Sequence, residues 1–455
     1  MSGTLALALA ALLPAFLHGV ASAQDAMRTD TLSLSDALVL AERHSPELAR
    51  ARNGVRAAGA GRRAARAALL PRVDASTSFD VTRVRRFTTT DAFGDPAVRE
   101  EAVETTSRGA SQGVFLDWTL FDGGRSLAGS RAAGARHRAA VAALEAARSR
   151  VRAEVARAYF QLLERRRTLD IERAILEARR RDLETTERLF PIVGVDLIDV
   201  LGARIEVRRQ EAVVATAEES ALAAGLELAR AVGAKVDPEA RVGAPFEPFD
   251  PDSLDVGALV REALAAHPEI RGLAAQAEAA GAETWGTGWL AYLPDVTAGA
   301  SYLRSEFGGS IRPFFELDPR DTALSFGLRL TLPLFDGFAR HAERVRSKTA
   351  AADAEAALRS RTLEAETGIR ARFLELRSAW RGLEIEVETA KMARERANLA
   401  RETYALGAID FTRLQQILDG ATEAERALVQ RQSDYYRALI ELERAVGRPV
   451  APPVG

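Results

Sequence analysis

The sequence predicts a mainly α-helical chain with four β-strands, built from a duplicated helix–strand–strand–helix unit. Three observations support this fold class: motifs that recur at fixed spacings, segments with strand-like alternation, and long proline-free segments with a seven-residue apolar repeat. We expect the first repeat at residues 24–233 and the second at 254–455, with a proline-rich linker at 234–253. The chain has 455 residues, which allows two or three ordinary domains or one elongated domain.

The duplication is visible in five pairs of motifs. The sequence Leu-Phe-Asp-Gly at 120–123 recurs 214 residues later at 334–337, and the segments 159–163 and 228–233 have counterparts at the same spacing. Nearer the N-terminus, Ser45-Pro46-Glu47 matches His267-Pro268-Glu269 at a spacing of 222, and Leu70-Pro71 matches Leu293-Pro294 at 223. The change in spacing places the longer strand loop in the first repeat.

The N-terminus predicts an exported protein. An apolar segment from Leu5 to Val20 ends at Ala21-Ser22-Ala23, a small-x-small pattern typical of signal-peptidase cleavage. A transmembrane anchor is the alternative, but the segment is shorter than the ~20 residues that a spanning helix needs. We therefore expect residues 1–23 to be a signal peptide.

Each repeat is expected to begin with two helices. The first is short, at residues 34–43 and 255–266. Ser45 and His267 then occupy N-cap positions, because each precedes a proline and a glutamate that suit the first turn of a helix. The second helices should end where Pro71 and Pro294 follow.

Alternating apolar and polar residues predict two strands in each repeat, within hairpins at 73–121 and 295–335. The clearest alternation covers Val73–Thr82, Val114–Leu120, Val296–Tyr302 and Leu324–Leu334. A strand of about ten residues can cross a bilayer at a tilt. The connecting loops, 83–113 and 304–321, should then be extracellular.

Very long helices should follow each hairpin. Residues 125–190 contain no proline, and apolar residues recur there every seven positions, as they do in the second repeat. A sustained seven-residue step predicts a supercoiled helical seam. A helix of 65 residues would be about 98 Å long at ~1.5 Å per residue. Each should turn and return, over 197–232 and 411–446. The repeating positions are Val155, Leu162, Leu169, Leu176, Leu183 and Phe190, and Ile369, Leu376, Leu383, Ala390, Ala397 and Tyr404.

Four amphipathic strands cannot close a barrel alone, and open sheet edges in lipid would leave main-chain groups unpaired. Several chains must therefore share a barrel. Two chains give eight strands and a barrel filled by side chains, whereas three give twelve and leave room for a lumen. A soluble sheet with a solvated polar face is the alternative. In a barrel, the polar faces would line the lumen. The lumen candidates are Asp74, Asp80, Asp117 and Arg329.

The chain resembles the TolC-like outer-membrane efflux family. The resemblance rests on the duplicated plan, the Ser-Pro-Glu and His-Pro-Glu openings, the Leu-Pro helix ends and the Leu-Phe-Asp-Gly junctions, and it covers roughly residues 32–450. It implies a homotrimer with a 12-stranded transmembrane β-barrel in the outer-membrane lipid, continued by a long α-helical tunnel in the periplasm. It also implies docking onto a periplasmic membrane-fusion adaptor and an inner-membrane pump.

The function expected from this resemblance is a passive conduit for efflux or type I secretion. The alternative is a periplasmic coiled-coil adaptor or scaffold, which should lack the two hairpins. An enzyme is disfavoured, because the sequence has no phosphate-binding loop, no nucleophile elbow and no histidine spacing for a metal. We therefore expect no cofactor and no metal. The net charge of −2 excludes a nucleic-acid binder.

In the family, the turns between the long helices form the inner end of the tunnel, and acidic residues just past them constrict it. The resemblance makes Asp196, Asp199, Asp410, Arg413 and Gln416 the candidates for a periplasmic gate. The family often has aspartate where this chain has Arg413 and Gln416, so its negative ring should be weakened here. Arg413 could instead pair with Asp199 or Asp410 and hold the tip closed. Capping of the turns is the alternative role.

Three aromatic residues are candidates for membrane-interface anchors. Trp285, Trp289 and Tyr292 have i, i+4 and i+7 spacing, which would place them on one face of the helix that ends before Pro294. Such side chains favour the headgroup zone of a membrane. Ordinary helix packing is the alternative interpretation.

Overall fold

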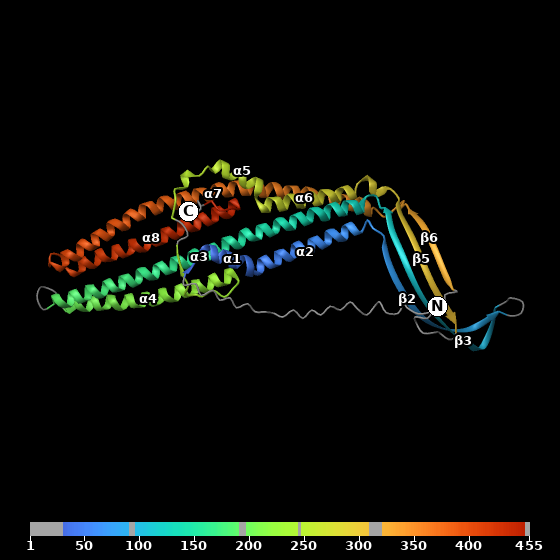
Figure 1. Ribbon diagram of the computed structural model, residues 1–455, viewed down its shortest axis with the longest axis horizontal. Coiled ribbons are helices and arrows are strands. Elements are labelled where there is room, and N and C mark those ends of the chain that lie inside the picture. The colour runs from blue at the N-terminus through green and yellow to red at the C-terminus, as the bar shows by residue number, and fades with distance from the viewer. Residues whose placement is uncertain (1–30, 91–95, 191–196, 244–246, 309–320, 451–455) are drawn as a thin grey trace, which may run out of the picture.

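The computed structural model describes residues 31–90, 96–190, 197–243, 247–308 and 321–450. The molecule is elongated, with a curved sheet at one end and long helical hairpins at the other (Figure 1). The expected signal peptide, residues 1–23, lies outside the described residues.

Two short helices in each repeat precede the strands: α1 (Leu34–His44) and α2 (Pro46–Ala67), then α5 (Val256–Ala266) and α6 (Pro268–Gly286). The predicted caps are confirmed. Ser45 Oγ accepts the Leu48 N–H at 3.5 Å, and His267 Nδ1 accepts the Glu269 N–H at 3.3 Å. Burial lowers the pKa of His267, which keeps the ring neutral and able to accept this bond.

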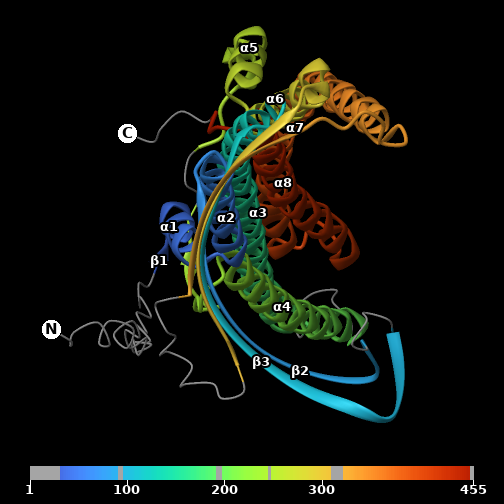
Figure 2. The same cartoon turned by 90° about the vertical axis from the view of Figure 1, so that its right-hand side faces the viewer.

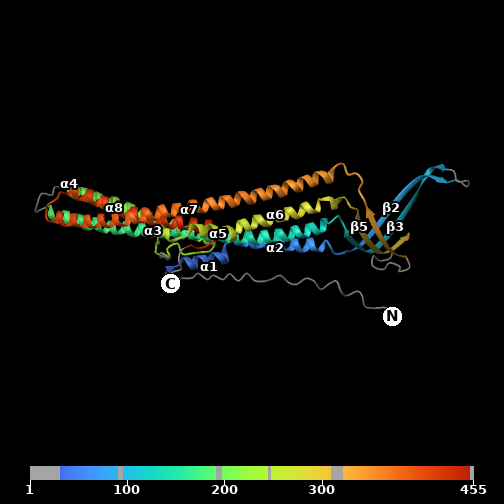
Figure 3. The same cartoon turned by 90° about the horizontal axis from the view of Figure 1, so that it is seen from above.

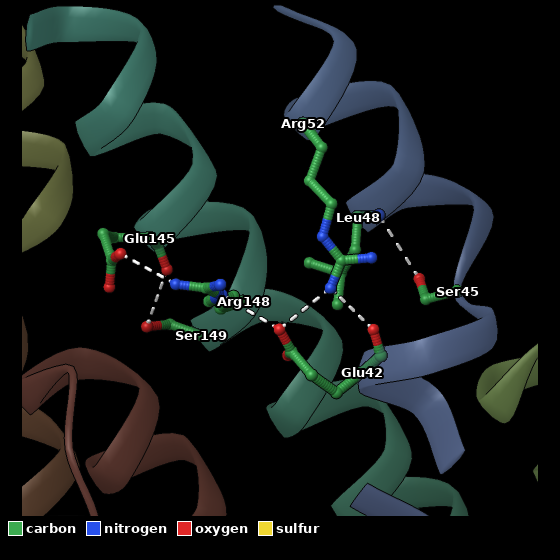
Figure 4. A network of polar contacts seen from close by, with 7 residues as sticks. All are labelled: Glu42, Ser45, Leu48, Arg52, Glu145, Arg148 and Ser149. Atoms are coloured by element: carbon green, nitrogen blue, oxygen red, sulfur yellow. Dashed lines mark hydrogen bonds and ion pairs between the residues drawn. The ribbon is translucent and has the colours of Figure 1, made fainter. Parts of the chain in front are cut away.

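Glu42 of α1 accepts hydrogen bonds from arginines of the two neighbouring helices (Figure 4). Arg52 of α2 donates to the Glu42 carbonyl at 2.7 Å and to its carboxylate at 3.0 Å. Arg148 donates to the same carboxylate at 3.1 Å and to Glu145 at 2.9 Å. Nearby, β1 (Thr31–Leu32) pairs in parallel with β4 (Arg241–Val242), so part of the linker packs against the first repeat. The short 3-10 helix η1 (Pro251–Ser253) follows.

The two hairpins form one antiparallel sheet of four strands, in the order β2-β3-β5-β6. The strands are β2 (Arg72–Thr90), β3 (Pro96–Phe121), β5 (Asp295–Gly308) and β6 (Thr322–Thr331). The hairpins join through β3 and β5, with pairs such as Val114 with Tyr302. Within the described residues, β2 and β6 are therefore the two edges of the sheet.

The expected loop at 83–113 is wrong. β2 continues to Thr90 and β3 begins at Pro96, so most of that segment is paired strand. Main-chain pairing continues there without a regular alternation of apolar and polar side chains, so the sequence pattern does not reveal it. β6 ends at Thr331 and not at Leu334, because Pro333 has no N–H to donate to the ladder. Residues 309–320 of the second expected loop lie outside the described residues.

Four long helices form two hairpins, α3 (Arg125–Leu189) with α4 (Leu197–Val232) and α7 (Ala339–Ala405) with α8 (Phe411–Val446). The seven-residue seams are buried as predicted: Val155, Leu162, Ile369, Leu376 and Ala390 are each 0% exposed. Phe190 is the exception, at 47% exposed, because it lies beyond the last residue of α3.

Candidate channel faces and gate

The strand register places the apolar residues of the sheet on one face. Residues directly opposite each other in an antiparallel pair share a face. Val73 lies opposite Leu116, Leu116 opposite Ala300, and Ala300 opposite Phe326. On β6, this face carries Leu324, Phe326, Leu328 and Leu330, which are 65–78% exposed. This is a broad apolar surface that nothing in the described chain covers.

The predicted lumen candidates share the opposite face. Asp117 pairs with Arg72, and Arg329 pairs with Thr297, which lies opposite Thr119. Asp74 and Asp80 follow the same alternation along β2. At the foot of this face, a cavity of about 880 Å³ is lined by Arg72, Asp117, Thr119, Thr297 and Arg329, together with the end of α2.

Tight turns join the strands to the long helices. Gly123 and Gly124 have φ values of +66° and +79°, and a Cβ on Gly123 would lie 2.5 Å from the carbonyl oxygen of Leu290. Only glycine fits there. Arg125 Nη2 then donates to both carboxylate oxygens of Asp295, at 2.7 and 2.8 Å. The first turn of α3 is thus fixed to the first residue of β5.

The three aromatic residues do not lie on one helix, so that prediction is wrong. α6 ends at Gly286, and Trp289 and Tyr292 belong to a separate 3-10 helix, η2 (Trp289–Tyr292). Gly288 has an extended backbone between the two helices, which interrupts the helical conformation. All three side chains are still partly exposed, at 39% for Trp285, 69% for Trp289 and 42% for Tyr292. Arg131 lies over the Trp285 ring and Arg340 over the Tyr292 ring.

The gate candidates lie at the ends of the long hairpins, apart from Asp196, which is outside the described residues. Asp199 is half-buried in the first turn of α4. Asp410 is the N-cap of α8, and its carboxylate accepts the Arg413 N–H at 2.6 Å. The Arg413 and Gln416 side chains are exposed. The chain therefore presents a cation and an amide beside a capping carboxylate at this tip.

Sequence reasoning missed the polar contacts between the two hairpins. We call these contacts, between α3 and α8, the charged seam. Glu172 accepts two hydrogen bonds from Arg426, at 2.6 and 2.8 Å, and one from Gln210 of α4 at 2.6 Å. A signal was present, because four of the five α3 residues, Arg157, Glu164, Glu172 and Arg179, recur at steps of seven, eight and seven, with Arg167 outside this series. The α3–α8 pairs are Arg157–Glu441, Glu164–Ser433, Arg167–Gln432, Glu172–Arg426 and Arg179–Asp419.

Two carboxylates on α3 have pKa shifts of opposite sign, although burial disfavours the charge of both. Burial opposes ionisation of Glu172, but hydrogen bonds from Arg426 and Gln210 outweigh it and lower its pKa. Burial raises the pKa of Asp182 even though Arg401 of α7 lies 3.5 Å away. Near the tip, Thr186 and Tyr404 share a hydrogen bond of 3.2 Å. α3 is thus linked to both helices of the other hairpin.

The described residues offer neither a helical membrane span nor a metal site. No described helix has the combined length and hydrophobicity of a transmembrane helix. No cluster of three or more histidine, aspartate or glutamate side chains there is arranged to bind a metal ion.

A family model described as "Outer membrane efflux protein" matches residues 37–234 and 259–448. The chain belongs to the outer membrane efflux protein family. The two matched segments correspond to the two repeats, and the family identification made from the motifs is confirmed. Membership of this family also confirms that the chain is not an enzyme.

Individual proteins show the same similarity. Protein CyaE of Bordetella pertussis is 29% identical over 341 residues, which cover 73% of this chain and 66% of CyaE, just under two thirds of its length. The outer-membrane protein VceC of Vibrio cholerae is 21% identical, with a TM-score of 0.73 over 92% of this chain and 97% of VceC. The CmeC channel of Campylobacter jejuni is 15% identical, with a TM-score of 0.75 over 91% and 85%. The mainly helical fold with few strands is therefore shared with outer-membrane channels.

Proposed function

We propose that this chain is one protomer of a homotrimeric outer-membrane channel for efflux or type I secretion. In this proposal the channel is passive, extends into the periplasm, and docks there onto a membrane-fusion adaptor and an inner-membrane pump. The observation that carries the proposal is a four-stranded sheet with two open edges, one apolar face and one polar face. Three such sheets give a closed 12-stranded barrel with no unpaired edge in lipid.

The helices support the same assembly. α7 has a second apolar stripe on the side away from α8, and it is more than half exposed. A helix face of this kind requires a partner, and α4 also exposes Leu201, Ile205 and Leu226. α3 contacts α8 within the protomer, which leaves α4 and α7 as the outer helices of the row. We infer that α7 packs against α4 of the next copy. The α7 stripe consists of Leu363, Leu374, Ile385, Met392 and Leu399.

The assembly is tested through Leu399. Leu399→Asp places a charge in the inferred interface and should abolish the heat-labile, slowly migrating trimer on denaturing gels. Asn398→Asp adds the same charge one residue away and should leave the trimer intact. The parent chain should be a trimer that requires detergent. A monodisperse monomer that is soluble without detergent would exclude the shared barrel.

The gate is tested by electrical recording in planar bilayers. Three Arg413 side chains near one axis oppose cations, so Arg413→Asp should raise cation selectivity. Asp199→Ala together with Arg413→Ala should raise the open conductance if these side chains hold the tip closed. Each exposed pair is worth only ~0–1 kcal/mol, so all three subunits must contribute. Unchanged reversal potential and conductance in both variants would assign these residues to capping alone.

A periplasmic adaptor or scaffold is the second candidate function. Such a protein should lack the two β-hairpins, and the described residues contain both. Fractionation of cell membranes separates the two candidates, because an adaptor would not copurify with outer-membrane lipid.

A further inference from the structure

The two repeats differ in charge where their second helices approach the sheet. The α2 sequence holds six arginines and one glutamate, whereas α6 holds one arginine and three glutamates. Arg63 and Trp285 both stand 17 residues after the proline that opens their helix. Arg66 and Trp289 both stand five residues before the proline that precedes the strand. The first repeat therefore has arginines where the second has partly exposed tryptophans.

These arginines are not neutralised within the described chain. Arg52 is the α2 arginine that forms an ion pair within the described residues, and the Arg62 Nε is buried there without a hydrogen-bond acceptor. Arg63 and Arg66 are exposed. Four carboxylates where the helices meet the sheet already have cationic partners, in the pairs Arg72–Asp74, Arg125–Asp295, Arg136–Glu283 and Arg340–Asp336.

The arginines form a stripe on the outer side of α2. Arg52, Arg56, Arg63 and Arg66 follow one another at steps of four, seven and three, which is one side of a helix. Arg52 in this stripe contacts Glu42 of α1. Seen along the long axis, α1 lies outside the curve of the sheet (Figure 2), although it is distant from the sheet along that axis (Figure 1). The stripe therefore faces away from the hollow of the sheet. Arg63 and Arg66 are its members nearest the sheet.

We propose that Arg63 and Arg66 bind the phosphate groups of anionic phospholipids in the periplasmic leaflet of the outer membrane. The inference rests on the proposed membrane-spanning sheet. A guanidinium group matches a phosphodiester with two parallel N–H donors. The helix dipole favours a cation in the last turn of α2 and so accounts for Arg66, but Arg63 lies nearly one turn earlier.

The arrangement of the helices places the basic and the aromatic membrane anchors on different helices. α2, α3, α6 and α7 lie side by side as they approach the sheet (Figure 3). Within one protomer, the arginines lie near the end of α2 and the tryptophans lie near the end of the α6–η2 segment. α3 lies between these two segments. Around a trimer, basic and aromatic anchors would alternate at one membrane depth. The aromatic rings suit the headgroup zone of any phospholipid, whereas the arginines add a preference for negative charge.

Trp118 provides a local reporter for the test. Its Nε1 donates to the carbonyl oxygen of Leu69 at 3.1 Å, three residues beyond Arg66. The trimer is reconstituted with Trp118 as the sole tryptophan, after Trp285→Phe, Trp289→Phe and Trp380→Phe. Its fluorescence is quenched with brominated phosphatidylglycerol or brominated phosphatidylcholine. We expect phosphatidylglycerol to be preferred at least about five-fold, the effect of one cation near a membrane surface.

In the double variant Arg63→Gln with Arg66→Gln, the ratio of phosphatidylglycerol to phosphatidylcholine binding should fall close to one. The matched control, Arg50→Gln with Arg56→Gln, removes the same charge from the same helix. Arg56 lies about 15 Å from Arg66 along α2, beyond the ~10 Å screening length of 0.1 M salt. This control should retain the preference. In the parent chain, 0.5 M sodium chloride should abolish it.

Three results would overturn the proposal: no preference in the parent chain, an equal effect of the control pair, or retention of the preference in the Arg63 and Arg66 variant. Inorganic phosphate, compared with chloride at equal ionic strength, separates the two sources of the ligand chemistry. If phosphate alone removes the preference, the site binds the free anion and not the lipid. Conductance is recorded in parallel. Normal channels without lipid preference refute this inference alone, whereas failure of the parent chain to insert refutes the proposed function.

Discussion

The contacts inside the two long hairpins are mainly apolar, whereas the contact between α3 and α8 combines charged pairs with an apolar part in which the Phe160 and Tyr436 rings stack at 4.4 Å. Inside each hairpin, buried leucine, valine and alanine side chains repeat every seven residues. Between α3 and α8, the charged seam joins arginines to carboxylates and an amide, and the Ser433 hydroxyl donates to the Glu164 carboxylate. Apolar burial is non-directional and favours stability, whereas charged hydrogen bonds require one geometry. The difference indicates two apolar hairpins whose joint adds position-specific charged pairs to its apolar part.

The largest effect is expected inside a hairpin. Leu376 is 0% exposed between α7 and α8. Leu376→Ala removes buried methyl groups and leaves a cavity, which should cost about 3 kcal/mol of unfolding free energy. Urea unfolding followed by helical circular dichroism, at one protein concentration, measures it. Leu376→Met keeps most of the volume and should cost less than ~1.5 kcal/mol. Equal losses for both substitutions would contradict a tightly packed seam.

The charged seam should be sensitive to removal of one partner only. The Glu172 side chain is 3% exposed and that of Arg426 is 46% exposed. Glu172→Leu leaves Arg426 without its acceptor, whereas Gln210 keeps the backbone carbonyl of residue 172 at 3.1 Å. The substitution should cost about 2 kcal/mol, below the value for a fully buried pair because Arg426 reaches solvent. Glu172→Leu with Arg426→Leu should recover stability to within ~1 kcal/mol of the parent. A double variant no more stable than the single one would show that the seam cannot accept apolar contact.

The two carboxylates on α3 should give opposite responses to pH. The pKa of Glu172 is lowered from 4.5, so its charge stabilises the fold above pH 4.5, and this contribution declines as pH falls through the lowered pKa. The pKa of Asp182 is raised from 3.8, so its charge destabilises the fold at neutral pH until protonation removes the penalty. At pH 7, Glu172→Gln should be less stable than the parent chain and Asp182→Asn more stable. Both differences in unfolding free energy should shrink as the pH falls from 7 to 3. Parallel pH profiles would contradict these assignments.

The smallest effect is expected at the end of the charged seam nearest the sheet. Arg157 donates to Glu441 at 2.6 Å, but its side chain is 44% exposed. Pairs in contact with water are worth little, so Arg157→Gln should cost under ~1 kcal/mol in the same urea assay. A loss as large as that of Glu172→Leu would show that burial does not set the strength of these contacts.

The sequence predicted the helical part of the fold better than the sheet and the gate. The bounds of α4 and α8 match the expected 197–232 and 411–446 because their apolar repeat and flanking turns are local signals. The lengths of β2 and β3 were underestimated, since polar strands keep their main-chain pairing without alternation. The charged seam was missed because arginine and glutamate on a long helix usually indicate a solvated face. The roles of Asp199, Asp410, Arg413 and Gln416 remain predictions, because they depend on neighbouring copies.

The pairing of β3 with β5 has a consequence for how the protein folds. Val114 and Tyr302 are direct neighbours in the sheet although 188 residues separate them along the chain. Each hairpin can close quickly by itself, but joining them requires a loop that contains α3, α4, α5 and α6, and such long-range closure is slow. The first hairpin must therefore wait, with its β3 edge unpaired, until the second has formed. During this interval the β3 edge can pair with strands of other chains, which would lower the yield of folded protein. A chaperone that shields strand edges should therefore raise that yield.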